Sequence, residues 1–342
     1  MAAPSDIQLT WFLVIGILFA AYAILDGFDL GIGFWYLLTR KDEDRRTLLN
    51  AIGPLWDGNE VWLIAGGAGL FAAFPLAYAT VFSSLYLAVM VVLWALIFRA
   101  VSFEFRSQLA SRAWQNIWDF AFAIASILLA LLLGVAMGNV LHGLPLDSSK
   151  NFDGEFLDLL NPYALLVGLL GLAMFATHGA LYLTWRTNDP IATQAKQWAF
   201  IAWIAYLALF IIVSLFTIID QDHLLDNFED NFLLWVVPLL GLAAILLIGG
   251  LQRKDMYFFA FIASAASIAL LLAIAGVSLY PNIVPALDAD LSISIKEAAS
   301  SDDTLTVMLM IALIGMPLVL IYTAWMYKIF VSEKVTLGAD SY

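Results

Sequence analysis

The chain has 342 residues, of which 63% are hydrophobic and only 13% are charged. A soluble domain usually carries about 25% charged residues, so this composition excludes an ordinary soluble fold. The net charge of −13 comes mainly from acidic loops, and the 15 Lys and Arg residues lie in short scattered clusters that give no support for nucleic-acid binding. Because there is no cysteine, disulfides and thiolate metal sites are excluded as well.

From the N-terminus onward, nine apolar runs stand between polar breaks, each about as long as the roughly 20 residues that a helix needs to cross a bilayer. The runs are continuous, whereas a membrane β-barrel would show segments of about 10 residues with alternating polarity. The sequence therefore predicts an all-α polytopic membrane protein with nine transmembrane helices. The predicted spans are residues 9–38, 50–74, 76–104, 117–141, 161–185, 197–219, 231–250, 256–280 and 305–330.

The basic residues predict the orientation of these spans. With the N-terminus outside, most of the 15 Lys and Arg residues lie in segments on the inner side. Only Lys150 and Lys296 then lie outside, and Arg99 lies within the third span. Positive charge is retained on the cytoplasmic side, so the pattern indicates an outside N-terminus and an inside C-terminus.

A weak internal duplication predicts how the helices are grouped. The first and fifth spans each carry an ionisable residue followed by glycine, namely Asp26-Gly27 and His178-Gly179. This favours two four-helix bundles related as a parallel pseudo-repeat about an axis along the membrane normal, plus one additional helix. The whole is predicted as a single membrane domain. The predicted domain covers residues 1–341. Within it, the first four-helix unit covers 9–141, the second covers 161–280 and the ninth helix covers 305–330.

Ionisable residues recur within the first three spans. Each costs about 2.5–3.5 kcal/mol at a helix centre on insertion scales, so their recurrence points to function. One arginine cannot balance four carboxylates, and carboxyl groups that take up and release protons are what a proton path needs. The alternative is a set of bridges that only pack the helices. The predicted path consists of Asp26, Asp29, Asp57, Glu60, Arg99 and Glu104, in one cluster towards the inner side, supported by Trp56, Asn59, Trp62, Arg106 and His178.

The histidines argue against metal and haem ligation by this chain. Only His178 lies within a span, and it is expected to be a hydrogen-bonded residue between helices. A haem needs one or two axial His, Met or Cys ligands. No histidine stands at ligand spacing from the acidic residues, and the Glu-x-x-His pattern of di-iron bundles is absent. We therefore expect neither haem ligands nor metal ligands.

Three motifs in order along residues 22–106 resemble a known family, the second subunit of cytochrome bd-type quinol oxidases. They are Leu25-Asp26-Gly27-Phe28-Asp29-Leu30-Gly31, then Gly53-Pro54 followed by Trp56-Asp57-Gly58-Asn59-Glu60-Val61-Trp62-Leu63-Ile64, and Arg99-Ala100-Val101-Ser102-Phe103-Glu104-Phe105-Arg106. Beyond them the likeness rests on length, the nine spans and His178-Gly179-Ala180.

The resemblance implies a haem-free subunit II of a terminal oxidase in the bacterial cytoplasmic membrane. The family's complex oxidises quinol and reduces O₂ to water, with two b-type haems and one d-type haem in the partner subunit I. Subunit II is implied to supply a proton route from the cytoplasm and a scaffold, in contact with lipid. The resemblance leaves room for a bound quinone in this chain and for a small accessory subunit. On this hypothesis protons enter near Glu104 and Arg106, pass Asp57 and reach Asp26 and Asp29.

Two other functions stay open on the sequence alone. An ion-coupled secondary transporter could use the same carboxyl groups for H⁺ or Na⁺, although the paired broken helices that usually mark such a site are not apparent. A purely structural assembly partner with an inert polar cluster is the other alternative.

Overall fold

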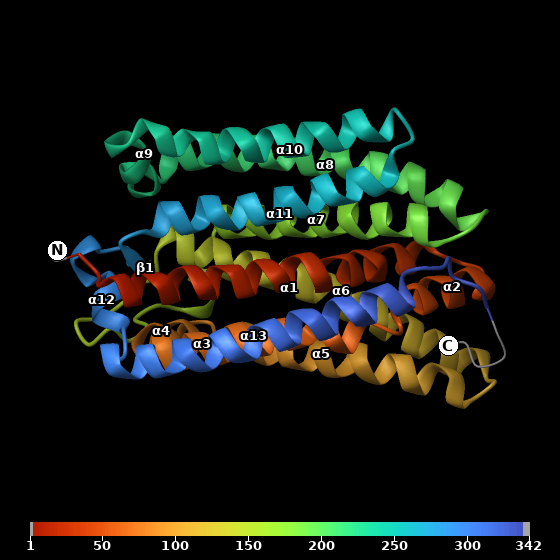
Figure 1. Cartoon of the computed structure of the whole chain (residues 1–342), viewed down its shortest axis with the longest axis horizontal. Helices are drawn as coiled ribbons and strands as arrows, with labels where there is room; N and C mark the ends of the chain where they lie inside the picture. The colour runs from red at the N-terminus through yellow and green to blue at the C-terminus, as the bar shows by residue number, and fades with distance from the viewer. Residues whose placement is uncertain (1–2, 338–342) are drawn as a thin grey trace.

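The computed structural model describes residues 3–337, so the predicted single domain, 1–341, extends beyond the described residues at both ends. Long antiparallel helices make up most of this part of the chain (Figure 1). Eight helical segments within it are long and apolar enough to cross a membrane. They are Asp6–Leu38, Tyr86–Gln108, Arg112–His142, Pro162–Arg186, Ile191–Asp220, Phe232–Gln252, Tyr257–Leu279 and Asp302–Phe330.

The α-helices follow the predicted spans closely, within a few residues at most ends. Their bounds are α1 Asp6–Leu38, α2 Asp42–Ile52, α3 Trp56–Ala73, α4 Pro75–Ser84, α5 Tyr86–Phe105, α6 Arg112–His142, α7 Pro162–Arg186, α8 Ile191–Asp220, α9 Asp226–Asp230, α10 Val236–Gln252, α11 Tyr257–Leu279, α12 Ile295–Ala298 and α13 Asp302–Phe330. Short 3₁₀ turns lie at Arg106–Gln108, Phe156–Leu160, Asp222–Leu224, Phe232–Trp235 and Ala289–Leu291.

The structure differs from the predicted spans in two places. The start of the second span belongs to α2, a separate helix with three acidic residues in its first turn, and α3 alone, at 18 residues, is not among the eight membrane-length segments. The third span is divided into α4 and α5 at Leu85. Between the predicted spans, strands β1 (Asn282–Val284) and β2 (Ile293–Ser294) form a small antiparallel sheet, and the rest of the described fold is helical, as predicted.

Local sequence explains where several helices begin. The side chain of Asn161 accepts a hydrogen bond from Ala164 N, and Pro162 occupies the first position of α7. Ser301 caps α13 in the same way, and two acidic residues follow it in the first turn. Such caps satisfy backbone N–H groups that have no partner within the helix, and negative charge is favourable at that end.

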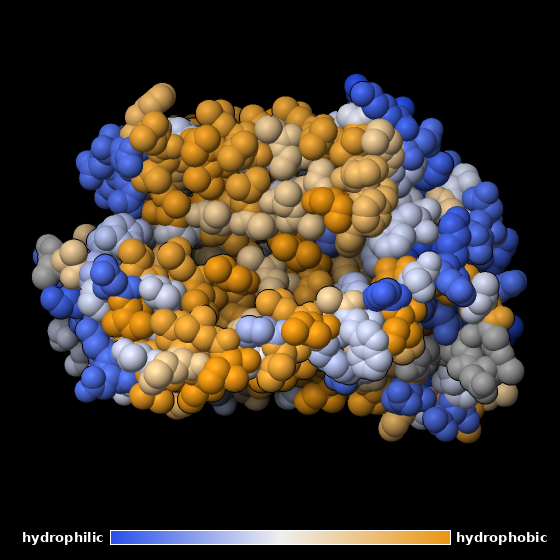
Figure 2. Space-filling model, viewed as in Figure 1, coloured by the Kyte–Doolittle hydropathy of each residue, from blue (hydrophilic) through white to orange (hydrophobic). Residues whose placement is uncertain are grey.

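The helices pack in two groups. Helices α7, α8, α10 and α11 lie together, helices α1, α3, α5 and α6 form the neighbouring group, and α13 lies across the surface of α1 and α3 (Figure 1). Figure 2 shows a broad hydrophobic band around the middle of this face, with hydrophilic residues gathered at both ends of the long axis. A belt of this kind is what a lipid bilayer requires of a protein that spans it.

At one of the places where the two groups meet, α1 packs closely against α7 at Gly31 and Gly179. A Cβ atom added to Gly31 would lie 1.9 Å from the carbonyl oxygen of Phe175, and one added to Gly179 would lie 2.6 Å from the carbonyl carbon of Gly31. No side chain separates the backbones at this point. Small residues allow this close approach, which is a common way for membrane helices to associate.

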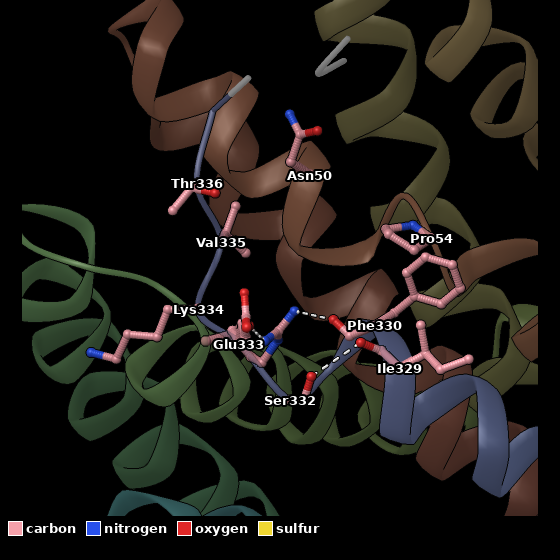
Figure 3. Close-up of a pocket in the computed structure, with 10 residues that line it drawn as sticks. Asn50, Pro54, Ile329, Phe330, Ser332, Glu333, Lys334, Val335 and Thr336 are labelled. Carbon is pink, nitrogen blue, oxygen red and sulfur yellow. Dashed lines mark hydrogen bonds between the residues drawn. The ribbon is translucent and has the colours of Figure 1, made fainter. Parts of the chain in front are cut away.

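The segment after α13 folds back over the end of α7 (Figure 3). Arg186, only 4% exposed, donates hydrogen bonds to the carbonyl oxygens of Phe330 at 2.8 Å and Val331 at 3.1 Å, and also to that of Glu333. Val335 N returns a bond to Arg186 O at 2.8 Å. Arg186 thereby satisfies carbonyl groups that the end of α13 leaves without helical partners.

Candidate functional site

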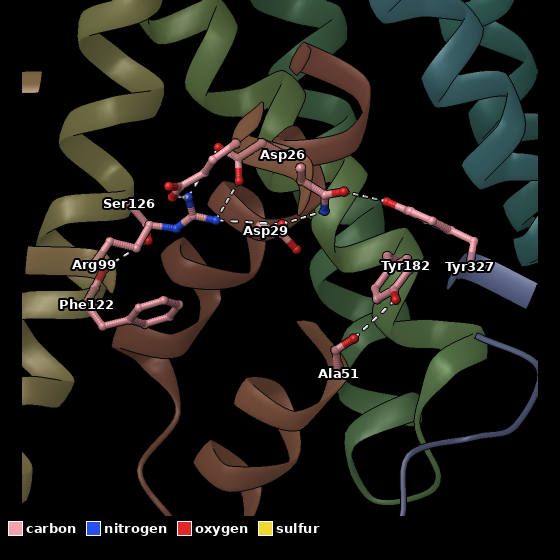
Figure 4. Close-up of polar contacts among 10 residues, drawn as sticks. Asp26, Asp29, Ala51, Arg99, Phe122, Ser126, Tyr182 and Tyr327 are labelled. Carbon is pink, nitrogen blue, oxygen red and sulfur yellow. Dashed lines mark hydrogen bonds and ion pairs between the residues drawn. The ribbon is translucent and has the colours of Figure 1, made fainter. Parts of the chain in front are cut away.

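A buried cluster of one arginine and three carboxyl groups lies where side chains of α1, α3 and α5 meet (Figure 4). The side chain of Arg99 is 0% exposed. Its Nη2 atom lies 2.6 Å from Asp26 Oδ1, and its Nη1 atom lies 2.7 Å from Glu60 Oε1. A longer distance, 3.7 Å, separates Nη2 from Asp29 Oδ2. We call these four residues the Arg99 cluster.

The charges in the Arg99 cluster do not balance. Three carboxyl groups face one guanidinium, so full ionisation would leave an excess of two negative charges. Buried charges are strongly disfavoured unless they are paired. The site is therefore suited to hold protons. Glu60 has 18% of its side chain exposed whereas Asp26 and Asp29 have 0%, so Glu60 is the acid through which the cluster reaches the surface of this chain.

The Arg99 cluster extends by hydrogen bonds to α13. Asn59 Nδ2 donates to Asp29 Oδ2 at 2.8 Å, and the hydroxyl of Tyr327 donates to Asn59 Oδ1 at 2.8 Å. Asn59 was expected to be a supporting residue, but Tyr327 was missed because a tyrosine near the end of a span resembles an interfacial anchor.

Asp57 and Glu104 do not join the Arg99 cluster, so the predicted single group of six residues is divided. Both side chains are exposed at the surface of this chain, on α3 and α5 respectively. Of the supporting residues, Trp56 stacks on Phe103 with ring centroids 5.0 Å apart, and Trp62 is buried.

Arg106 belongs to a second, separate network centred on Asp119. Arg106 Nε lies 2.5 Å from Asp119 Oδ1, and Arg45 Nη1 lies 2.7 Å from Asp119 Oδ2. The hydroxyl of Tyr36 also donates to Asp119, and Arg106 Nη2 pairs with Asp42 at 2.6 Å. We call these five residues the Asp119 network. The sequence contained one signal for it, an acidic residue at the start of the fourth predicted span.

Aromatic rings separate the Asp119 network from the Arg99 cluster. Trp56 stacks on Phe103, and Phe103 in turn contacts Phe122 with ring centroids 5.2 Å apart. Phe122 contacts Tyr36 with centroids 5.1 Å apart. Phe103, Phe122 and Tyr36 are each 1% exposed. On α5, Phe103 falls between Arg99 and Arg106 in the chain. This aromatic layer leaves no polar contact between the two ionic groups among the described residues.

The Asp119 network predicts a pH-dependent contribution to stability. Burial alone would raise the pKa of Asp42. The hydrogen bond and the positive charge of Arg106 lower this pKa by more than burial raises it, so it lies below its ordinary value. We expect Asp42→Asn to lower the free energy of unfolding by less than about 1 kcal/mol at neutral pH, because 39% of the side chain is exposed and screened.

The folded-state pKa of Asp42 is depressed, so the wild-type advantage is present above about pH 4 and is lost as the pH falls through the folded-state value. Thermal melts of the purified protein and the variant, in a series from neutral to acid pH, measure it. A difference in melting temperature that does not shrink on acidification contradicts the prediction.

His178 lies between helices and is fully buried. Its Nδ1 atom is 3.1 Å from Ser264 Oγ and its Nε2 atom is 3.1 Å from Ile24 O, so both ring nitrogens have hydrogen-bond partners. This histidine therefore does not fit an axial haem ligand. Among residues 3–337, no group of three or more His, Cys, Asp or Glu side chains is arranged to hold a metal ion.

Comparison with known proteins agrees with the architecture. Residues 7–330 match the family described as cytochrome bd terminal oxidase subunit II. The chain is 35% identical to cytochrome bd-I ubiquinol oxidase subunit 2 of Escherichia coli (strain K12), over 94% of this chain and 93% of that protein. It is 32% identical to cytochrome bd ubiquinol oxidase subunit 2 of Bacillus subtilis (strain 168), over 96% of each.

A solved structure shares the fold. The bd oxidase structure from Geobacillus thermodenitrificans matches with a TM-score of 0.79 at 17% identity, covering 96% of this chain and 100% of the matched one. The eight membrane-length segments and these relatives identify a multi-pass protein of the bacterial inner membrane. The match over residues 7–330 and the identity to curated relatives show that the chain belongs to the cytochrome bd terminal oxidase subunit II family.

Proposed function

We propose that this chain is the haem-free subunit II of a membrane terminal oxidase that oxidises quinol and reduces O₂ to water. Its relatives carry the name of ubiquinol oxidase subunit 2, which supports a quinol substrate for the complex. The haems, two of b type and one of d type, reside on a partner subunit I. Family membership gives no support to the ion-coupled transporter.

The observation that carries the proposal is the unbalanced charge of the Arg99 cluster. Three carboxyl groups and one guanidinium in a water-poor site can take up and release protons, which O₂ reduction consumes. We infer that this chain supplies a proton-uptake path to the partner and holds it in place as a scaffold.

The aromatic layer changes the route expected from the sequence. Uptake through the Asp119 network would have to cross the rings of Phe103 and Phe122, which carry no group able to relay a proton. Entry through the exposed side chains of Glu104 and Asp57 and the partly exposed Glu60, which we call the exposed edge, avoids that barrier. We therefore propose entry along this edge, with Glu60 passing protons to Asp26 and Asp29.

The same edge is proposed to face the partner. An exposed carboxylate within a hydrophobic belt is costly against lipid, so the surface around Asp57 and Glu104 is better covered by protein or water. The proposed path would then deliver protons to the partner subunit, which would hold the O₂-reducing haem. A bound quinone in this chain, a small accessory subunit, and contacts with quinol, O₂ and lipid belong to the same proposal.

The full topology is also proposed. Helix α3 is counted as the ninth span, because its Glu60 pairs with Arg99 and the part of the helix after Glu60 is apolar. The outside N-terminus and inside C-terminus follow from the basic residues. The two helix groups are proposed to be a parallel pseudo-repeat, with α13 as the additional helix.

Substitution of Glu60 and Asp57 tests the path. We expect Glu60→Gln and Asp57→Asn each to lower oxidase turnover and proton uptake by the assembled complex roughly tenfold or more, because a neutral amide cannot relay the proton. Glu43→Gln is the matched control, since Glu43 is an exposed acid on α2 outside both ionic groups. Unchanged turnover and membrane-potential generation in both variants, with all haems present, would refute the path.

A further inference from the structure

Helix α13 makes polar contacts near its two ends and has few fully buried residues between them. Near its start, Trp11 Nε1 donates to Leu305 O at 2.9 Å. Near its end, Tyr327 donates to Asn59, and Arg186 binds the carbonyl groups that follow. Only 6% of the residues in the most apolar stretch of α13 are buried. The polar contacts at its ends therefore hold this helix in place together with partly buried side chains such as Met308 and Leu309.

The contact at Tyr327 leads directly into the Arg99 cluster. The Tyr327 hydroxyl donates to Asn59 Oδ1 at 2.8 Å, and Asn59 Nδ2 donates to Asp29 Oδ2 at 2.8 Å. Asn59 is 1% exposed and Asp29 is 0% exposed, so bulk water does not compete for these bonds. A continuous hydrogen-bonded chain thus joins α13, α3 and α1 (Figure 4).

Asp29 is the acid in the cluster that depends most on this chain. Both carboxyl oxygens of Asp26 bond to Arg99, at 2.6 Å and 3.2 Å. Asp29 has only a 3.7 Å contact with Arg99, and its Oδ1 atom has no hydrogen-bond partner among the described residues. The N–H of Asn59 is therefore the nearest hydrogen-bond donor to Asp29.

The amide of Asn59 has one donor end and one acceptor end, so its orientation matters. An ionised carboxyl group can only accept hydrogen bonds and requires Nδ2 to face it. Rotation of the amide would present Oδ1 instead, which only a protonated Asp29 could bond. The Tyr327 hydroxyl donates to Oδ1 in the first orientation, and because a phenol oxygen can also accept a hydrogen bond, it holds the amide in either orientation. We propose that Tyr327 is a positioning residue that holds the amide of Asn59 within hydrogen-bond distance of Asp29.

The consequence for turnover rests on the proposed proton path. Besides Asn59, the ionisable groups of Asp26, Arg99, Tyr182 and Tyr327 act on Asp29, from α1, α5, α7 and α13. Of these groups, Tyr327 also bonds to the amide of Asn59. Through it, the placement of α13 determines how closely the amide of Asn59 approaches Asp29 when a proton arrives.

Tyr327→Phe tests the inference in the assembled complex, because it deletes the hydroxyl and keeps the ring. We expect oxidase turnover to fall about tenfold with haem content unchanged, which corresponds to a lost hydrogen bond in a chain that ends on a charged group. Tyr322→Phe is the matched control: it lies on the same helix with 57% of its surface exposed. Equal turnover in the two variants would overturn the inference.

Infrared difference spectroscopy separates positioning from a merely structural role. The carboxyl C=O band that Asp29→Asn removes should shift in Tyr327→Phe and stay in place in Tyr322→Phe. Adding Tyr327→Phe to Asn59→Leu should cause no further loss of turnover, since the amide is already absent. If Asp29→Asn leaves turnover unchanged, the proton path fails, whereas the infrared comparison still decides the role of Tyr327. A band that does not move in Tyr327→Phe overturns that role.

Discussion

Arg99→Met is expected to destabilise the protein by about 3–5 kcal/mol, because it leaves three buried or partly buried carboxyl groups without a cation. We expect a large drop in the yield of folded protein from membranes and in its melting temperature in mild detergent. The loss should greatly exceed the effect of any substitution at an exposed arginine such as Arg112.

A compensating variant distinguishes lost charge balance from lost packing. Arg99→Met combined with Asp26→Asn, Asp29→Asn and Glu60→Gln removes all three carboxyl groups along with the cation. Replacing all partners of a buried ionic group is often nearly neutral, so most of the stability should return while turnover stays low. Arg99→Met melting like the wild type would show that the cluster has no role in stability.

Gly31→Ala is expected to prevent normal packing of α1 on α7. The added methyl group would lie 1.9 Å from the carbonyl oxygen of Phe175, which is backbone and cannot rotate away. We expect a loss of about 3 kcal/mol or more, since overpacking against a rigid neighbour forces the helices apart. Gly16→Ala is the control on the same helix, because a methyl group there meets no atom within 4 Å.

Yield and melting temperature of the two alanine variants, prepared side by side, provide the comparison. Gly16→Ala should behave like the wild type. If Gly31→Ala does so too, the close crossing of α1 and α7 does not contribute to stability.

The helices were largely predictable because membrane spans are defined by composition and length, which are local properties. The predicted span 161–185, for example, corresponds to α7 at Pro162–Arg186. Helix α2 was missed because 11 residues of mixed polarity are too short to stand out as a span. The break at Leu85 was missed because it contains neither glycine nor proline, the usual signals of an interrupted helix.

The candidate site was predictable in part for a related reason. Asp26, Glu60 and Arg99 are conspicuous in apolar sequence, since each is costly there. Their grouping depends on how each helix is rotated against its neighbours, which a single sequence does not contain. Asp57 and Glu104 thus lie outside the Arg99 cluster, and Arg106 pairs with Asp119 on the far side of the aromatic layer.

The glycine crossing of α1 and α7 also bears on how the molecule can move. In an alternating-access transporter, one half of the protein moves relative to the other. Such movement is easier where side chains, and not backbones, form the contact between the halves. Here no side chain separates the backbones of α1 and α7 at Gly31 and Gly179, and this close packing opposes sliding of the two helix groups past one another. A frame of this rigidity is suited to hold an acid at a constant distance from a neighbouring reaction centre, which is a different task from carrying a solute across.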